Sequence, residues 1–273
     1  MTKKYFFFLT TVLFVVSCSN NGNEQNNSGN DNVELSSAPP VLPYAVVNVL
    51  PHDTSSFTEG LLIHNGQLFE STGGQPSISN FKSWFGPVDI KTGKPLRKIM
   101  LDTSYFGEGI AILNGNLYQL TWEDRKGFVY DATTFKKLRE FTYNGEGWAL
   151  TDDGTHLIMS DGSSNLQYLD PVTLKVVKIL GVTDNNGPVG NLNELEYING
   201  YIYANQYLTS YIVKIDPSSG KVTGKMDFTA LDHEVKTKLP QALEMNGIAF
   251  DSAAGKIFVT GKAWPNMYEI KFN

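Results

Sequence analysis

The sequence predicts an all-β protein, a five-bladed β-propeller whose ring is closed by its N-terminal strand. Two observations carry this prediction. From Tyr44 onward, short alternating apolar runs are separated by Gly, Asn and Asp turns, a pattern typical of many strands. Two turn markers recur along the same stretch, and repeats of about 45 residues that hold four short strands are typical of propeller blades.

The first marker is an Asp followed by a small turn, in DIKTGK, DATTFK, DPVTLK and DPSSGK, with gaps of 42, 39 and 46 residues. These aspartates are Asp89, Asp131, Asp170 and Asp216. The second marker is a Gly-centred turn, in HNGQ, LNGN, DDGT, INGY and AAGK, with gaps of 49, 39, 46 and 55 residues. These glycines are Gly66, Gly115, Gly154, Gly200 and Gly255.

The apolar runs between these turns group into blades. Four blades of four strands are expected over residues 57–101, 106–143, 147–180 and 192–228. The fifth blade, 246–272, supplies only three strands, and its outer strand is expected from residues 44–50. Pairing the first and last segments closes the ring and covers edges that an open sheet would expose. Within the long connection 225–245, ALDHEVKTKL is expected to form one or two helical turns.

The first forty residues predict targeting rather than fold. Lys3 and Lys4 precede a short apolar run that ends at VVSC, which is typical of a secretory signal. We therefore expect residues 1–17 to be a signal peptide. The only cysteine, Cys18, follows directly and resembles the lipoprotein box of bacteria, in which this residue is acylated. An ordinary signal followed by an incidental cysteine is the alternative.

Lipidation at Cys18 predicts an exported protein that is anchored to the bacterial cell envelope, at the outer membrane or the periplasmic face. Residues 18–40 contain almost no apolar side chain, so we expect a flexible tether there. Residues 41–273 are then expected to form the propeller.

Composition excludes several classes of function. A single cysteine among 273 residues excludes a disulfide framework and a cysteine-based zinc cluster. The four histidines form no HxxxH or HExxH spacing, so no metal and no cofactor is predicted, although ligands from distant segments would escape this test. The formal charge of −6, without a basic stripe, argues against nucleic-acid binding. We expect a monomer.

Polar residues from every blade are expected to converge at the channel, because the first strand of each propeller blade lines the central axis. They are Glu59, Glu108, Glu146, Asn193, Glu194 and Asn246. Crowded carboxylates in a partly dry channel mouth raise one another's pKa, which favours a general acid or base. The alternative is that these side chains bond neighbouring strands and fix blade packing, and we favour it for Glu146 and Glu194.

Aromatic residues and one lysine add to this picture. Trp122 and Trp148 lie at strand ends, where they are expected to wall a small pocket beside Glu108. A core position is the alternative for both tryptophans. Lys262 interrupts the apolar strand IFVTGKAW, which is costly unless its ammonium meets a carboxylate or a substrate oxygen.

Eight motifs in order resemble the glutamine cyclotransferase family, the plant- and bacterial-type glutaminyl-peptide cyclotransferases, over residues 44–273. They are FTEGL, YFGEGIA, LYQLTW, GFVYDA, GEGWAL, LIMSDGS, LNELEY and VTGKAWP. The resemblance implies a five-bladed propeller of the acyltransferase class. It also implies that the substrates are peptides or proteins with an N-terminal Gln, which is converted to pyroglutamate with release of ammonia and without zinc.

The resemblance also implies roles for individual residues. Glu108 in YFGEGI matches the catalytic Glu of the family. The residues that match substrate-binding positions are Phe57, Glu59, Phe106, Trp122, Trp148, Asn193, Tyr207 and Lys262. Two of them depart from the family pattern: many relatives have Gln at Glu59, and Trp at Tyr207 of ANQY. The second departure leaves open which residue is preferred after the Gln.

Two other functions remain open at this point. A non-catalytic propeller lipoprotein that acts as a binding or assembly module is one, because propellers host many functions. A calcium-dependent propeller hydrolase of the lactonase type is the other. Its axial metal would be held by residues such as Glu59, Glu108, Asn193 and Asn246.

Overall fold

Strands make up most of residues 37–272, the part of the chain that this computed structural model describes. These residues belong to one compact unit, Ser36–Asn273. The expected signal peptide, Cys18 and most of the expected tether lie outside the described residues. Within the described part, no helix is long and apolar enough to cross a membrane.

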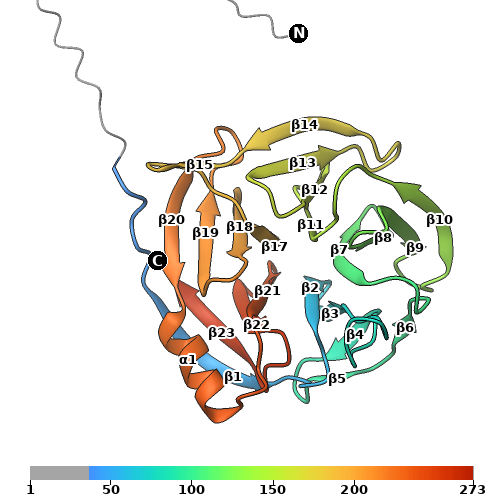
Figure 1. The fold of residues 1–273 in the computed structure, drawn as a ribbon, viewed down its shortest axis with the longest axis horizontal. Coiled ribbons are helices and arrows are strands. Elements are labelled where there is room, and N and C mark those ends of the chain that lie inside the picture. The colour runs from blue at the N-terminus through green and yellow to red at the C-terminus, as the bar shows by residue number, and fades with distance from the viewer. Residues whose placement is uncertain (1–36, 273) are drawn as a thin grey trace, which may run out of the picture. The chain divides into compact units, whose positions relative to one another are not determined.

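Five sheets surround a central axis as the blades of a propeller (Figure 1). Blade one contains β2 (Thr58–His64), β3 (Gln67–Thr72), β4 (Trp84–Asp89), β5 (Lys94–Pro95) and β6 (Ile99–Met100). Blade two contains β7 (Gly107–Leu113), β8 (Asn116–Thr121), β9 (Lys126–Asp131) and β10 (Lys137–Thr142). Blade three contains β11 (Ala149–Asp152), β12 (Leu157–Ser160), β13 (Asn165–Leu169) and β14 (Val176–Gly181).

Blades four and five complete the ring, and the predicted five-bladed fold is confirmed. Blade four contains β17 (Leu192–Ile198), β18 (Tyr201–Gln206), β19 (Tyr211–Ile215) and β20 (Val222–Asp227). Blade five contains β21 (Met245–Asp251), β22 (Lys256–Gly261), β23 (Asn266–Phe272) and β1 (Tyr44–Pro51). A small hairpin, which the sequence did not predict, lies between blades three and four and contains β15 (Thr183–Asp184) and β16 (Gly187–Pro188).

The N-terminal strand closes the ring as predicted. In blade five, β1 pairs antiparallel with β23, and the register runs from Tyr44 opposite Phe272 to Pro51 opposite Asn266. The first and last strands of the propeller therefore lie side by side in one sheet (Figure 1). Upstream of β1, the backbone continues onto blade four, where Lys225 N donates to Pro40 O at 2.9 Å. The N-terminal segment thus joins the last two blades.

Close packing of the inner strands at the axis depends on glycines and on one carboxylate. A Cβ at Gly60 would lie 2.8 Å from the backbone nitrogen of Ile110 on the neighbouring blade, a distance that only glycine allows. The carboxylate of Glu194 accepts the backbone N–H of Leu61 at 3.0 Å and of Ile248 at 2.8 Å. Glu194 therefore joins three blades, which agrees with the structural role favoured for it above.

Two local features differ from the expectation. The outer strand of blade one is split into β5 and β6, and β5 ends at Pro95, whose backbone cannot donate a hydrogen bond. The helix α1 (Thr229–Lys238) is longer than expected, with 10 residues, because Leu231 and Val235 are buried against the core of blades four and five.

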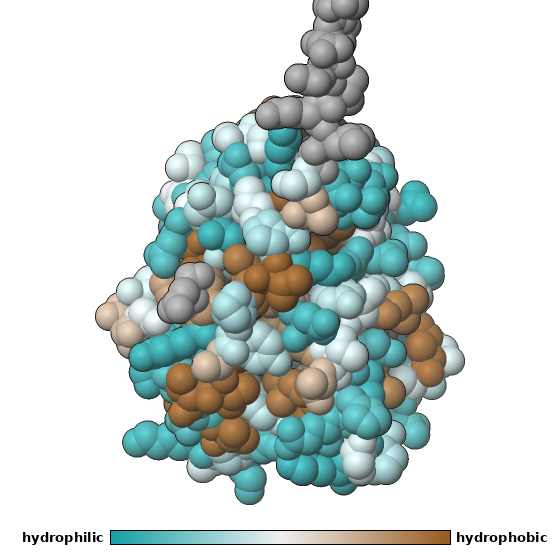
Figure 2. Space-filling model, turned by 90° about the vertical axis from the view of Figure 1, so that its left-hand side faces the viewer, coloured by the Kyte–Doolittle hydropathy of each residue, from teal (hydrophilic) through white to brown (hydrophobic). Residues whose placement is uncertain are grey.

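The hydrophobic core lies between the blades, in clusters of buried side chains that each span two neighbouring sheets. Large side chains such as Trp84, Phe85, Phe228 and Trp264 are fully buried there. On the side that carries β20 and α1, the visible surface is mainly hydrophilic, and exposed hydrophobic residues stand in small separate groups (Figure 2).

Candidate active site

A cavity of about 380 Å³ brings together all nine residues predicted for the site. The predicted residues that line it are Phe57, Glu59, Phe106, Glu108, Trp122, Trp148, Asn193, Tyr207 and Lys262. Four further residues complete the lining: Ile78, Ser79, Phe81 and Leu243. The geometry expected from blade topology is therefore present.

Blade topology explains this convergence. Glu59, Glu108 and Asn193 are each the second residue of an inner strand, on β2, β7 and β17. Because the inner strands of all blades start at the same end of the channel, side chains at these starts meet at one mouth. Trp122 and Lys262 directly follow the second strands of blades two and five, which end at that same mouth.

A buried ion pair lies on one side of the cavity. Lys262 Nζ lies 2.7 Å from Glu59 Oε1, and the two side chains are 6% and 3% exposed. Asn246 donates from Nδ2 to Glu59 Oε2 at 3.1 Å. Burial raises the pKa of Glu59 to about 7, although the charge of Lys262 opposes the rise. Burial lowers the pKa of Lys262, but Glu59 and Glu108 outweigh this effect and raise it, so the amine stays protonated.

Glu108 is the second buried acid and is 5% exposed. Burial is the main cause that raises its pKa well above the usual value, and the negative charge of Glu59 adds to the rise. Among residues 37–272, no hydrogen bond reaches the carboxyl of Glu108. A protonated carboxyl that lines a cavity without an internal partner is available to donate a proton to a bound molecule.

Two tryptophans share one carboxylate oxygen. Trp122 Nε1 donates to Glu146 Oε2 at 2.7 Å, and Trp148 Nε1 donates to the same oxygen at 2.8 Å. Both rings line the cavity, so neither is a core residue. We interpreted Glu146 as a packing residue from the sequence. Its carboxylate in fact holds the indole N–H groups of both tryptophans and so fixes the orientation of their rings. The sequence placed it in a Gly-rich turn and gave no signal for this contact.

Aromatic contacts continue around the cavity. The ring of Trp148 meets Tyr207 edge to face, with centroids 5.4 Å apart, and the ring of Phe106 meets Trp122 at 5.8 Å. Phe106 in turn lies 5.9 Å from Phe57. Such edge contacts hold each ring against its neighbour. The result is a nearly continuous aromatic wall around the acids.

Asn193 provides an unpaired polar group inside this wall. The residue is 3% exposed and lines the cavity. Its Oδ1 is buried and has no hydrogen-bond partner within residues 37–272. Since an unpaired buried amide is costly, this group is suited to a polar atom of a ligand.

Comparisons with known proteins agree with this geometry. The family model of glutamine cyclotransferase matches residues 11–272. The chain belongs to this family. A glutaminyl-peptide cyclotransferase of Arabidopsis thaliana is 37% identical to it over 231 residues, which is 83% of this chain and 70% of the relative. The glutaminyl cyclase of Myxococcus xanthus, known from a crystal structure, superposes with a TM-score of 0.79 at 34% identity, covering 86% of this chain and 98% of its own.

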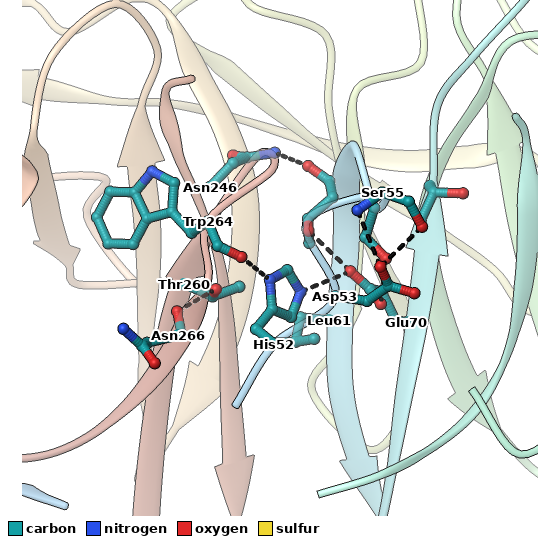
Figure 3. A network of polar contacts seen from close by, with 12 residues as sticks. His52, Asp53, Ser55, Leu61, Glu70, Asn246, Thr260, Trp264 and Asn266 are labelled. Atoms are coloured by element: carbon teal, nitrogen blue, oxygen red, sulfur yellow. Dashed lines mark hydrogen bonds and ion pairs between the residues drawn. The ribbon is translucent and has the colours of Figure 1, made fainter. Parts of the chain in front are cut away.

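In this member of the cyclotransferase family, a buried polar network links chain segments that flank the ion-pair residues in sequence (Figure 3). His52 contacts Trp264 O through Nδ1 at 2.8 Å and Glu70 Oε1 through Nε2 at 3.0 Å. Glu70 also accepts hydrogen bonds from Ser56 Oγ at 3.1 Å and Thr58 Oγ1 at 2.8 Å. The network therefore connects the segment before Glu59 with the segment after Lys262.

The two ring nitrogens of His52 require a proton shared with Glu70. A carbonyl oxygen only accepts, so Nδ1 must carry a hydrogen toward Trp264 O. Nε2 and Glu70 then need a second hydrogen between them. Burial lowers the pKa of His52, but Glu70 and Trp264 O outweigh it and raise that pKa, which favours an imidazolium paired with a carboxylate. No sequence motif predicted this pair.

Four lining residues escaped the sequence analysis. Ile78, Ser79 and Phe81 come from the β3–β4 loop, and Leu243 comes from the segment between α1 and β21. Loop residues follow neither strand periodicity nor a blade position. The one available signal was the presence of two large apolar side chains, Ile78 and Phe81, in an otherwise polar loop.

The metal-site alternative does not fit the side chains present. In the described part of the chain, no group of three or more His, Cys, Asp or Glu residues is placed to hold a metal ion. The ammonium of Lys262 sits 2.7 Å from Glu59, inside the ligand set that a lactonase-type site would need. A fixed positive charge there repels a cation.

Proposed function

We propose that the protein is a glutaminyl-peptide cyclotransferase that converts the N-terminal Gln of a peptide or protein to pyroglutamate and releases ammonia. The observation that carries this proposal is the carboxyl of Glu108, which has a raised pKa and no internal partner, in an aromatic cavity of a glutamine cyclotransferase family member. A pure binding module does not require such an acid.

The reaction joins two groups of the same residue. The neutral α-amine attacks the carbon of the side-chain amide, a new C–N bond closes the ring, and the bond to the amide nitrogen breaks. Since both reactants are already tethered, the protein must mainly hold the glutaminyl side chain in a folded shape. The rings of Trp122, Trp148 and Tyr207 exclude extended rotamers and so favour that shape.

Glu108 moves the proton between the two nitrogens. Its raised pKa favours the protonated form, which donates to the amide nitrogen as that nitrogen leaves as ammonia. The resulting carboxylate takes the proton that the attacking nitrogen must lose. One carboxyl therefore serves as acid and then as base, and it returns to its starting state.

Lys262 and Asn193 supply polar contacts to the substrate. The ammonium of Lys262, held by Glu59, is a donor for the oxyanion that develops on the attacked carbon or for the peptide carbonyl of the substrate. The unpaired Oδ1 of Asn193 is an acceptor, so it suits an N–H group of the substrate, on the α-amine or on the side-chain amide.

The cellular location forms a second part of the proposal. The basic start, the short apolar run and Cys18 in VVSC support export and lipid anchoring to a bacterial cell envelope. The polar segment 18–40 would then act as a tether, with the propeller as a monomeric catalytic domain.

Incubation of the purified protein with a Gln-initiated peptide tests the activity. We expect a mass loss equal to one ammonia and none for the same peptide with an acetylated N-terminus, because an acylated amine cannot attack. If the folded protein releases no ammonia from any Gln-initiated peptide, the proposed function is wrong and the result favours the binding-module alternative.

A further inference from the structure

A second cavity adjoins the active-site cavity on blade one. Its volume is about 600 Å³, and Phe81 lines both cavities. The other residues that line the second cavity come from Ser55, from the β3–β4 loop, and from the start of β4 and the region of β6 that pairs with it. The ring centroids of Phe81 and Phe57 lie 5.1 Å apart. The side chain of Phe81 therefore separates the second cavity from the active-site cavity.

The two cavities differ in charge. The active-site cavity is lined by the acids Glu59 and Glu108, whereas the second cavity is lined by the cations Lys82 and Lys98 and by no acid. Within residues 37–272, neither lysine has a carboxylate within 4.0 Å. Two unpaired ammonium groups in a chain of net charge −6 make this a local basic site.

The floor of this cavity orients one of the cations. Lys98 Nζ lies 4.5 Å above the ring centroid of Trp84, a cation–π arrangement, and Trp84 itself is 1% exposed. The one acid on the adjoining segment, Asp53, accepts two hydrogen bonds from Ser55 through Oδ1, at 2.9 and 2.7 Å. Burial raises the pKa of Asp53, but the hydrogen bonds from Ser55 and the charge of Lys98 outweigh this effect and lower that pKa. Asp53 therefore acts on Lys98 at a distance, without an ion pair within 4.0 Å, and both ammonium groups can still contact an external group.

A peptide substrate must leave the active-site cavity after its first residue. Only the N-terminal Gln reacts, and an extended chain advances by about 3.3 Å per residue. A second residue that passes Phe81 would bring the third and fourth residues over the neighbouring cavity. Carboxylate side chains at those positions would meet Lys82 and Lys98.

We propose that the cavity of Lys82 and Lys98 is a substrate subsite that favours Asp or Glu at the third and fourth residues of a Gln-initiated peptide. This inference rests on the proposed cyclotransferase function and names a substrate class for it. An exposed ion pair contributes modestly, so each matched carboxylate should raise kcat/KM by about 1.5- to 5-fold. The gain should appear in KM rather than in kcat, because the subsite lies away from the reacting atoms.

The test compares three peptides that differ only in charge, Gln-Ala-Glu-Glu-Ala, Gln-Ala-Ser-Ser-Ala and Gln-Ala-Lys-Lys-Ala, all with amidated C-termini. We expect the lowest KM for the Glu peptide and the highest for the Lys peptide, with differences that shrink at 0.5 M salt as screening increases. The double variant Lys82→Glu with Lys98→Glu should reverse the order. Lys82→Gln with Lys98→Gln should remove it.

Lys91 and Lys94 provide a matched control at the opposite end of β4, where Lys94 lies across from Asp89 in the strand register. Both are exposed, and Lys91→Glu with Lys94→Glu changes the net charge equally on the same blade. The wild-type order must survive in this control. Equal KM values of the wild type for the three peptides would overturn the subsite, and so would a reversed order in the Lys91→Glu with Lys94→Glu control as well as in Lys82→Glu with Lys98→Glu. Ammonia would still be released in those cases, whereas no release from any peptide would instead refute the proposed function.

Discussion

Lys262 Nζ and Glu59 Oε1 lie 2.7 Å apart and form an ion pair between two blades on one side of the candidate active site. The pair joins the end of β22 to the start of β2, and both side chains are almost fully buried. A buried pair of this kind is sensitive to the loss of one partner, because the remaining charge then has no compensation.

Removal of the lysine alone should therefore be damaging. Lys262→Met leaves Glu59 buried without its partner, and we expect a loss of about 3–5 kcal/mol in the free energy of unfolding, measured with urea. The double variant Lys262→Met with Glu59→Gln should recover most of that loss. Similar stabilities of the single and double variants would contradict an energetic coupling between the two residues.

The shared carboxylate of Glu146 should matter for activity more than for folding. Glu146→Ala frees the indole edges of Trp122 and Trp148, and the wall they form should loosen. We expect kcat/KM on a Gln-initiated peptide to fall by up to about 100-fold, as misplacement of substrate can cause, together with a change in tryptophan fluorescence.

Glu146→Gln is the matched control, because a Gln oxygen can still accept both indole hydrogens. It should retain most of the activity and the wild-type fluorescence. If the Gln and Ala variants lose activity equally, the charge of Glu146 would be what matters, and a role in positioning the rings would be excluded.

Ring closure by β1 is tested by truncation. A chain that starts at Val41 keeps β1 and should fold, whereas a chain that starts at Ser55 loses β1 and exposes the edge of β23. The longer chain should show a cooperative melt, and the shorter one should be insoluble or melt at a markedly lower temperature. Equal melting curves would argue that β1 is not needed for closure.

The anchor is tested by Cys18→Ser in cells. The variant keeps the apolar run before the cysteine but lacks the thiol that would carry the lipid. We expect the protein to leave the membrane fraction, as followed by fractionation and immunoblotting after a salt wash. Continued partition of the variant with membranes would remove the lipoprotein proposal and leave the cyclotransferase proposal untouched.

Much of the fold was predictable because a propeller repeats a short local unit. Turn residues such as Gly115 and Asp131 recur at matching positions within successive blades, and the missing outer strand of blade five pointed to residues 44–50. The inner-strand positions then placed Glu59, Glu108 and Asn193 at one mouth without any knowledge of their contacts. Repetition converts a position in the sequence into a position around the axis.

The remaining features depend on contacts that repetition does not encode. Glu146 lies in a turn, and which atoms its carboxylate meets depends on the path of that turn. Phe81 comes from an irregular loop. The proton shared by His52 and Glu70 depends on the carbonyl of Trp264, which lies 212 residues away along the chain. These long-range contacts are visible only in the folded chain.

The raised pKa of Glu108 also has a consequence for stability. Its folded-state pKa lies well above the unfolded value, so the folded chain holds a proton that the unfolded chain releases. Stability from this group is therefore present at low pH and is lost as pH rises from about 4.5 through the folded-state pKa. Glu108→Gln should melt like the wild type near pH 4 and at a higher temperature near pH 8.

The rate constant kcat of Glu108→Gln on a Gln-initiated peptide, measured beside that of the wild type, tests the central claim most directly. The variant keeps the shape of the side chain and removes its titratable proton. We expect kcat to fall by about 10²–10⁴-fold, as for a lost general acid or base, with a smaller change in KM and with folding intact. A folded Glu108→Gln protein with nearly wild-type kcat would contradict the account and would make Glu59 the next acid to examine.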